Sequence, residues 1–139
     1  MTAPSAEDLE RGHTVLAPDP FADDEERTRA WVVVNNERHP SNKEQYIVTA
    51  LTTRTWYEER IQPRETDYRH RRAPRESSIV PHAVASLRPE FVTDYVCRIR
   101  DEPLDRAVDT LVDSLRGSPR GCSPTETGTL VERARQARV

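Results

Sequence analysis

Arginines gather in one segment of this sequence, where they could act together on an anion. Five arginines against Glu65 and Asp67 leave a local charge of +3: Arg64, Arg69, Arg71, Arg72 and Arg75. Clustered guanidinium groups bind phosphates, and a ring beside them can stack on an unpaired base. Tyr68 and His70 are such rings. The segment predicts either a phosphate clamp or a solvated loop, and residue type alone does not choose between them.

A second stretch, residues 29 to 36, has polar side chains at both ends of an apolar run. It reads Arg-Ala-Trp-Val-Val-Val-Asn-Asn. Adjacent valines suit a pleated sheet, and a short apolar run bounded by turn residues is typical of a strand buried on both faces. We therefore expect a central strand with Arg29 at one end and Asn35 and Asn36 at the other. By residue type alone, Arg29 is a solvated flank and the asparagines close a turn.

Other short strands must surround this one. We expect them at residues 13–17, 45–51, 54–61, 77–80, 83–87 and 91–99. Pro81 cannot donate a ladder hydrogen bond, so residues 77–87 form either two strands or one bent strand. Six or so short strands indicate a small barrel or a curled sheet.

One amphipathic helix follows the last strand. Its apolar residues fall at i, i+3, i+4, i+7, i+8 and i+11: Leu104, Ala107, Val108, Leu111, Val112 and Leu115. This spacing makes a single apolar stripe. Asp101 can cap its start and Gly117 suits its exit. We therefore expect the helix to pack against the sheet.

The length of 139 residues allows one domain. Because 32% of the residues are charged, part of the chain is expected to lie outside the core. We predict a disordered lead at residues 1–9, a barrel domain at 10–117 and a flexible tail at 118–139. No apolar run approaches the roughly 20 residues of a membrane span, and the N-terminus has no signal pattern. We expect a cytoplasmic protein that does not bind membranes.

Charge and cysteine content narrow the function further. A net charge of -3 argues against a chain-wide nucleic-acid surface and against DNA binding, although a local patch could bind phosphate. Cys97 and Cys122 predict one buried and one exposed thiol rather than a disulfide. The four histidines lack metal-ligand spacing and are expected at the surface: His13, His39, His70 and His82. No metal or cofactor is expected.

The order of these pieces resembles the PemK/MazF family of toxin ribonucleases. The matching segments are residues 11–16, 29–36, 47–52 and 78–87, with the helix that follows Ile99. Members are usually dimeric and cut single-stranded RNA without a metal. The resemblance covers about Arg11 to Arg116 and implies a mainly β fold with α, a small SH3-like β-barrel with a C-terminal amphipathic helix. Gly12 matches the glycine of the family's opening turn, and His13 stands where an aspartate is usual.

The resemblance also implies a catalytic pair. Arg29 matches the arginine that begins the family's second strand, and Thr52 matches the threonine that ends the third. RNA carries its own nucleophile, the 2′-hydroxyl, so the protein must orient it and stabilise charge on the phosphorane. A guanidinium offers phosphate a planar fork of donors. Thr52 could bind a phosphate oxygen or orient the 2′-hydroxyl, but it is a poor general base.

Further residues complete the expected site. Possible catalytic support comes from His82 and Ser86. The substrate-binding residues are expected to be Asn36, Thr53, Arg64, Arg69, Arg71, Arg72, Ser77 and Ser78.

One segment departs from the family pattern. Before Ser86, where the family commonly has an acid, a glutamine, an apolar residue and an arginine, this chain has His82, Ala83, Val84 and Ala85. The glutamine and arginine positions are both alanine.

Three functions follow from these observations. The first is a metal-independent endoribonuclease toxin that cleaves single-stranded RNA, acts as a homodimer and is inhibited by a cognate antitoxin with an acidic tail. The alanines favour the second, a catalytically degenerate barrel that binds RNA or a protein partner. The third, a peptide-binding SH3-like adaptor, needs an aromatic groove that a dispersed 6% of aromatic residues does not predict.

Overall fold

The computed structural model describes residues 3–20 and 27–116. The flexible tail predicted at 118–139 and the thiol of Cys122 lie outside these ranges. Within them, no helix is long and apolar enough to span a membrane.

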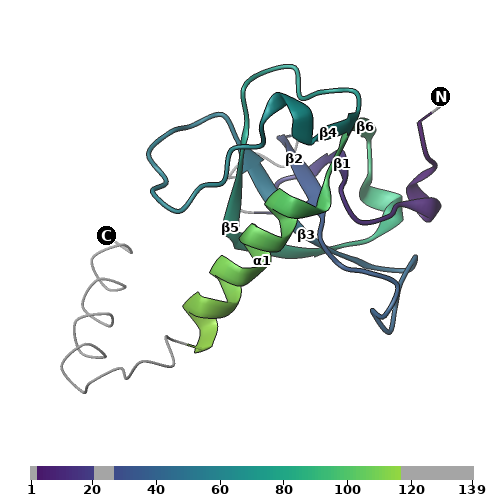
Figure 1. Ribbon diagram of the computed structural model, residues 1–139. Coiled ribbons are helices and arrows are strands. Elements are labelled where there is room, and N and C mark those ends of the chain that lie inside the picture. Colours follow the sequence, from purple (N-terminus) through teal and green to yellow (C-terminus); the bar gives the residue numbers. More distant parts are fainter. Residues whose placement is uncertain (1–2, 21–26, 117–139) are drawn as a thin grey trace.

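Six antiparallel strands form one sheet in the order β4-β6-β1-β2-β3-β5. The strands are β1 (His13–Pro18), β2 (Thr28–Val33), β3 (Tyr46–Thr52), β4 (Tyr68–His70), β5 (Ser78–Leu87) and β6 (Asp94–Ile99). The helices are the single-turn η1 (Ala6–Asp8), η2 (Glu65–Asp67) and η3 (Pro89–Phe91), and α1 (Asp101–Arg116). Figure 1 shows the sheet curling on itself, with α1 leaving it at the C-terminal end. The expected mainly β fold with a C-terminal helix is confirmed.

The central strand is buried on both faces, as its valines predicted. Trp31 and Val33 are each 1% exposed and lie in one apolar cluster, while Val32, fully buried, lies in the other. Successive residues of a strand point to opposite faces, so β2 joins the two clusters. The strand ends at Val33, and the asparagines that follow lie in a loop.

One of the other strand predictions and one loop prediction need correction. Residues 54–61 do not form a strand, because only Ile61 makes a bridge, to Ile79. The segment at 62–76, predicted as loop, contains η2 and the short strand β4. Residues 78–87 form one strand with an irregularity opposite Thr49 and Ala50, which settles the two possibilities left open by Pro81.

Only the first half of α1 packs against the sheet. Leu104 and Ala107 are buried in the second cluster, whereas Val112 is 37% exposed and Leu115 is 76% exposed. The C-terminal part of the apolar stripe is therefore exposed, since no described residue covers it.

Residues 6–9, which belong to the lead predicted at 1–9, contact β3 and the first apolar cluster. Leu9 is 1% exposed and belongs to the first cluster. The hydroxyl of Tyr46 donates to the Ala6 carbonyl at 2.9 Å and accepts from the Leu9 amide at 3.2 Å. Leu9 and Tyr46 hold this segment to the sheet, and the Lys43 ammonium also donates to the Leu9 carbonyl at 2.7 Å.

Candidate active site

Arg29, Thr52 and Ser78 come from three neighbouring strands at one end of the sheet. Thr52 of β3 lies directly opposite Ser78 of β5. Trp31 lies opposite Ala50 in the last pair of β2 and β3, and Arg29 and Thr52 each lie two residues beyond that pair on their own strand. Opposite residues of antiparallel strands point to the same face. We call these three residues the polar row.

The guanidinium of Arg29 is held against rigid structure. Its Nε donates to the carbonyl of Leu51, the residue before Thr52, at 3.4 Å. Its central carbon is 5.9 Å from the centroid of the Trp31 ring, a cation–π distance. Arg29 is half-buried. The side chain therefore lies close to the end of β3, where the remaining guanidinium N–H groups can reach an anion.

Two nearly buried hydroxyls complete the polar row. Thr52 is 9% exposed and Ser78 is 6% exposed. The Thr52 Oγ1 accepts a hydrogen bond from the Arg54 amide at 3.1 Å. Within residues 3–20 and 27–116, neither hydroxyl donates a hydrogen bond. Two hydroxyls with unused donors thus lie at the ends of the strands next to the one that carries Arg29, and hydroxyl and guanidinium donors both suit phosphate oxygens.

The arginine-rich segment is divided between several places rather than forming one clamp. Arg64, Arg72 and Arg75 line a hollow of about 660 Å³ together with Ser77, the residue before Ser78. This hollow therefore adjoins the polar row along the chain. Arg72 forms an ion pair with Glu65.

The other two arginines of this segment point elsewhere. Arg71 has a positive φ of 56° and places its guanidinium 5.2 Å from the centroid of the Tyr95 ring. Arg69 lines a different hollow, described below. Only part of the predicted clamp lies beside the polar row.

Two other predicted residues are not brought to the polar row by any described contact, and a third only follows it along the chain. Asn36 follows the opposite end of β2, where its Oδ1 accepts from the Arg38 amide at 2.9 Å. Ser86 lies opposite Ile47, five residues along β3 from Thr52, or roughly 17 Å at the usual strand rise. Thr53 directly follows the row and is exposed.

His82, the third candidate for catalytic chemistry, faces a loop. Its Nδ1 lies 2.9 Å from Glu59 Oε1, and its ring centroid is 5.8 Å from that of Tyr57. The residues of that loop were expected to be a strand and were not expected to bind anything. Trp56 is 64% exposed there, next to Tyr57, and the only sequence signal was two adjacent aromatic residues close behind Thr52.

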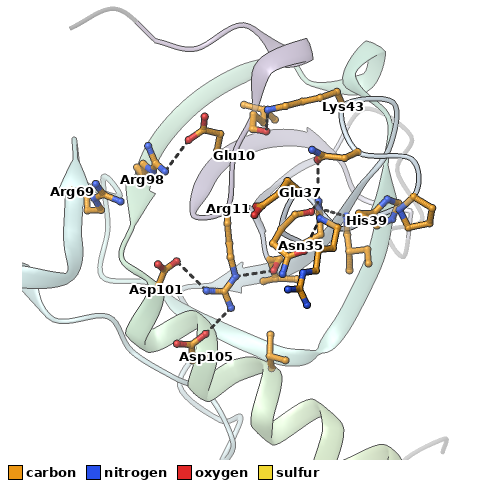
Figure 2. A pocket seen from close by; sticks show the side chains of 18 residues that line it. Glu10, Arg11, Asn35, Glu37, His39, Lys43, Arg69, Arg98, Asp101 and Asp105 are labelled. Atoms are coloured by element: carbon orange, nitrogen blue, oxygen red, sulfur yellow. Dashed lines mark hydrogen bonds and ion pairs between the residues drawn. The ribbon is translucent and has the colours of Figure 1, made fainter.

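A larger hollow of about 970 Å³ lies at the other end of β2 (Figure 2). Arg11 crosses it, donating to the Val34 carbonyl at 2.9 Å, to Asp101 at 3.0 Å and to Asp105 at 2.8 Å. These bonds tie α1 to the end of β2. Neither Arg29 nor Thr52 lines this hollow, although Asn36 and Arg69 do.

His13 is buried, contrary to the surface position expected. Its pKa falls from 6.5 to about 4, chiefly because burial disfavours the charged ring and then because Arg98 is positive. Its Nδ1 accepts a hydrogen bond from the Glu10 amide at 2.8 Å, which also favours the neutral ring. Cys97 is buried as predicted, and burial raises the pKa of its thiol to about 11. In the described ranges, no three histidine, cysteine or acidic side chains are grouped to hold a metal.

The fold resembles that of known ribonucleases, although comparison of sequences finds no match. No protein-family model matches the chain, and no curated protein matches it. A mycobacterial endoribonuclease solved with its cognate antitoxin aligns with a TM-score of 0.60 and 13% identity, over 80% of this chain and 98% of that one.

Two further structures agree. Another mycobacterial endoribonuclease gives a TM-score of 0.55 and 17% identity, over 87% of this chain and 98% of that one. MazF from Deinococcus radiodurans gives a TM-score of 0.59 and 14% identity, over 79% of this chain and 97% of that one. The expected resemblance is therefore confirmed at the level of the fold, which is MazF-like.

Proposed function

We propose that this protein is an endoribonuclease toxin that cleaves single-stranded RNA without a metal ion. The observation that carries the proposal is the polar row, in which Arg29, Thr52 and Ser78 meet at one end of β2, β3 and β5. The likeness of the fold to solved endoribonucleases supports it. A toxin of this kind would act on messenger RNA in the cytoplasm.

The chemistry that we assign to the polar row is attack of an RNA 2′-oxygen on the adjacent phosphorus. A new P–O bond forms, the bond to the 5′-oxygen of the next nucleotide breaks, and a proton passes from the nucleophile to the leaving group. Arg29 binds the non-bridging oxygens as their charge grows. Thr52 and Ser78 donate hydrogen bonds that fix the phosphate.

Proton transfer is the step to which the polar row contributes least. In the described chain, no histidine or carboxylate is hydrogen-bonded or ion-paired to Arg29, Thr52 or Ser78. His82 is engaged with Glu59 instead. We infer that the row works by orientation and charge stabilisation, with solvent exchanging the protons.

Single-stranded RNA is the substrate that the surroundings favour. A strand without a partner can bend so that one phosphate enters the row while its neighbours run along the hollow lined by Arg64, Arg72 and Arg75. These arginines would bind the backbone without reading its sequence.

We infer a protein inhibitor and a second copy of the chain as partners. One fold neighbour was solved with its cognate antitoxin. A partly disordered acidic tail on an antitoxin would compete with RNA for the same arginines, since carboxylates and phosphates bind guanidinium groups alike. A homodimer is the assembly implied by the resemblance.

The deciding experiment is incubation of the purified full-length chain with a defined single-stranded RNA in excess chelator. Cleavage by the wild type, lost in Arg29→Ala and retained in Arg38→Ala, is the expected result. Arg38 is the matched control, because it lies in the loop at the far end of β2. If the folded wild type leaves the RNA intact, the proposal fails.

A second candidate function rests on Ala83 and Ala85. Both are partly buried and pack against the first apolar cluster. Their methyl groups offer RNA no hydrogen-bonding partner. A barrel that binds RNA or a protein without cleaving is the function that would fit this loss. Tight RNA binding with no cleavage product, and no growth arrest when the gene is expressed alone, would favour this function over the toxin.

A further inference from the structure

Three rings lie near the polar row, two of them on the loop of residues 53–60 and the third, His82, on β5. Trp56 is 64% exposed and its ring centroid is 6.0 Å from that of Tyr57. The Tyr57 ring is in turn 5.8 Å from His82. We call these three residues the aromatic platform. Leaving so much indole in water forfeits hydrophobic stabilisation, so a partner that covers it would bind favourably.

The loop that carries the aromatic platform is fixed at both ends. Thr52, just before it, lies opposite Ser78. Ile61, just after it, exchanges two backbone hydrogen bonds with Ile79, of 2.9 and 2.7 Å. Both ends of the loop therefore meet at the start of β5.

The interior of the loop is also ordered by hydrogen bonds. The Arg60 guanidinium donates to the Tyr57 carbonyl at 2.9 Å, and the Arg54 amide donates to the Thr52 hydroxyl at 3.1 Å. Trp56 is four residues beyond Thr52 along the chain, and four residue steps span at most about 14 Å when extended. The aromatic platform is thus held within a few nucleotides of any phosphate bound at Thr52.

The charge beside the indole suits nucleic acid. The guanidinium carbon of Arg54 is 4.6 Å from the centroid of the Trp56 ring. This cation can pair with the phosphate of a nucleotide whose base lies on the ring, and arginine planes themselves stack on bases. The only acid paired to the platform, within the described residues, is Glu59, which is bound by His82.

We propose that Trp56 stacks on an unpaired base of the RNA that flanks the scissile phosphate, with Arg54 binding the backbone next to it. This inference rests on the proposed function of the polar row and adds a base-binding site to it. Since every base has a π-face, stacking here holds the strand in register without selecting its sequence.

The test uses the full-length chain and an RNA oligonucleotide that carries 2′-O-methyl groups at every position, so that no nucleophile is free and binding is measured without cleavage. Trp56→Leu should raise the Kd of the labelled oligonucleotide by about 5- to 150-fold, the range for losing one base–aromatic stack. Trp56→Phe should recover most of the affinity. Leu115→Ala, which alters a side chain that is 76% exposed on α1, should leave the Kd unchanged.

Intrinsic fluorescence gives an independent reading, because the chain has two tryptophans and Trp31 is only 1% exposed. Binding should quench the wild type and should leave the emission of Trp56→Leu unchanged. An unaltered Kd for Trp56→Leu overturns the stacking site but not the proposed function. If the oligomeric mass of Trp56→Leu also changes, the platform is a protein interface instead. No binding by the wild type overturns the proposed function as well.

Discussion

Thr52 and Ser78 face each other across β3 and β5, and neither hydroxyl donates a hydrogen bond within the described chain. Neither oxygen belongs to the buried side-chain atoms that lack a hydrogen-bond partner among the described residues, so the two donors stay available to a ligand. Here the ligand would supply acceptors, as the oxygens of a phosphate do, next to the guanidinium of Arg29.

Replacing Thr52 by valine should lower the rate of RNA cleavage by about 10²- to 10³-fold, the range for losing one preorganised donor. Valine keeps the shape of threonine and removes the hydroxyl. Thr52→Ser keeps the hydroxyl and should retain most of the activity. Single-turnover cleavage of a defined RNA measures both, and equal rates for the wild type and Thr52→Val would remove this hydroxyl from the mechanism.

Thr49→Val removes a hydroxyl from the same strand as Thr52→Val does, but it should stabilise the protein and leave cleavage unchanged. Thr49 is 2% exposed, and its Oγ1 has no hydrogen-bond partner among the described residues. Removing an unsatisfied buried hydroxyl should raise the free energy of unfolding by about 1 kcal/mol. Urea unfolding measures this change, and cleavage should be unaltered. A less stable Thr49→Val protein would mean that this hydroxyl has a partner after all.

Arg29→Lys should fail to replace the arginine. A lysine ammonium keeps the charge but lacks the planar fork with which arginine donates to the Leu51 carbonyl while its central carbon stays near the Trp31 ring. We expect cleavage to fall by at least about 100-fold, as for other misplaced groups. The thermal unfolding temperature should change little, because Arg29 is only half-buried. Full activity in the lysine variant would show that charge alone is sufficient.

Gly12→Ala should destabilise the whole domain. Gly12 has a φ of +95°, and a Cβ there would lie 2.2 Å from the Ile99 carbonyl oxygen. Backbone strain and this clash together should cost roughly 3 kcal/mol or more. The amide of Gly12 also donates to the Val33 carbonyl at 2.8 Å, so movement here would disturb β2. Denaturant unfolding tests this, with Thr28→Ala, an exposed change on β2, expected to cost less than about 0.5 kcal/mol.

The elements that the sequence predicted correctly are those with apolar residues on a buried face. The run from Trp31 to Val33 predicted β2 because these residues have no stable position except inside a sheet. Residues 54–61 were predicted as a strand from the same aromatic propensity, but Trp56 and its neighbours lack a partner strand. The short β4 was missed because three residues, one of them the exposed Arg69, show no period.

The polar row could be predicted only in part, because it depends on register. Val84 lies opposite Thr49, while Val80 lies opposite Ala50, so residues 81–83 of β5 have no partner on β3. A regular ladder continued from Thr49 would place Pro81 opposite Thr52. The bulge places Ser78 there instead, and it carries His82 out toward the loop. Pro81 marks the place of the irregularity, but nothing local in the sequence gives the size of the shift.

His13 should make stability depend on pH between about 6.5 and 4. Burial lowers its pKa to about 4 in the folded chain, so the unfolded chain binds the proton first as the pH falls. The contribution is fully present above pH 6.5 and is lost on acidification toward pH 4, by roughly 3 kcal/mol in all. Urea unfolding at pH 7, 5.5 and 4.5 should show this loss for the wild type and for His39→Gln. It should be reduced in His13→Gln, and an equal slope in that variant would assign the acid sensitivity to other groups.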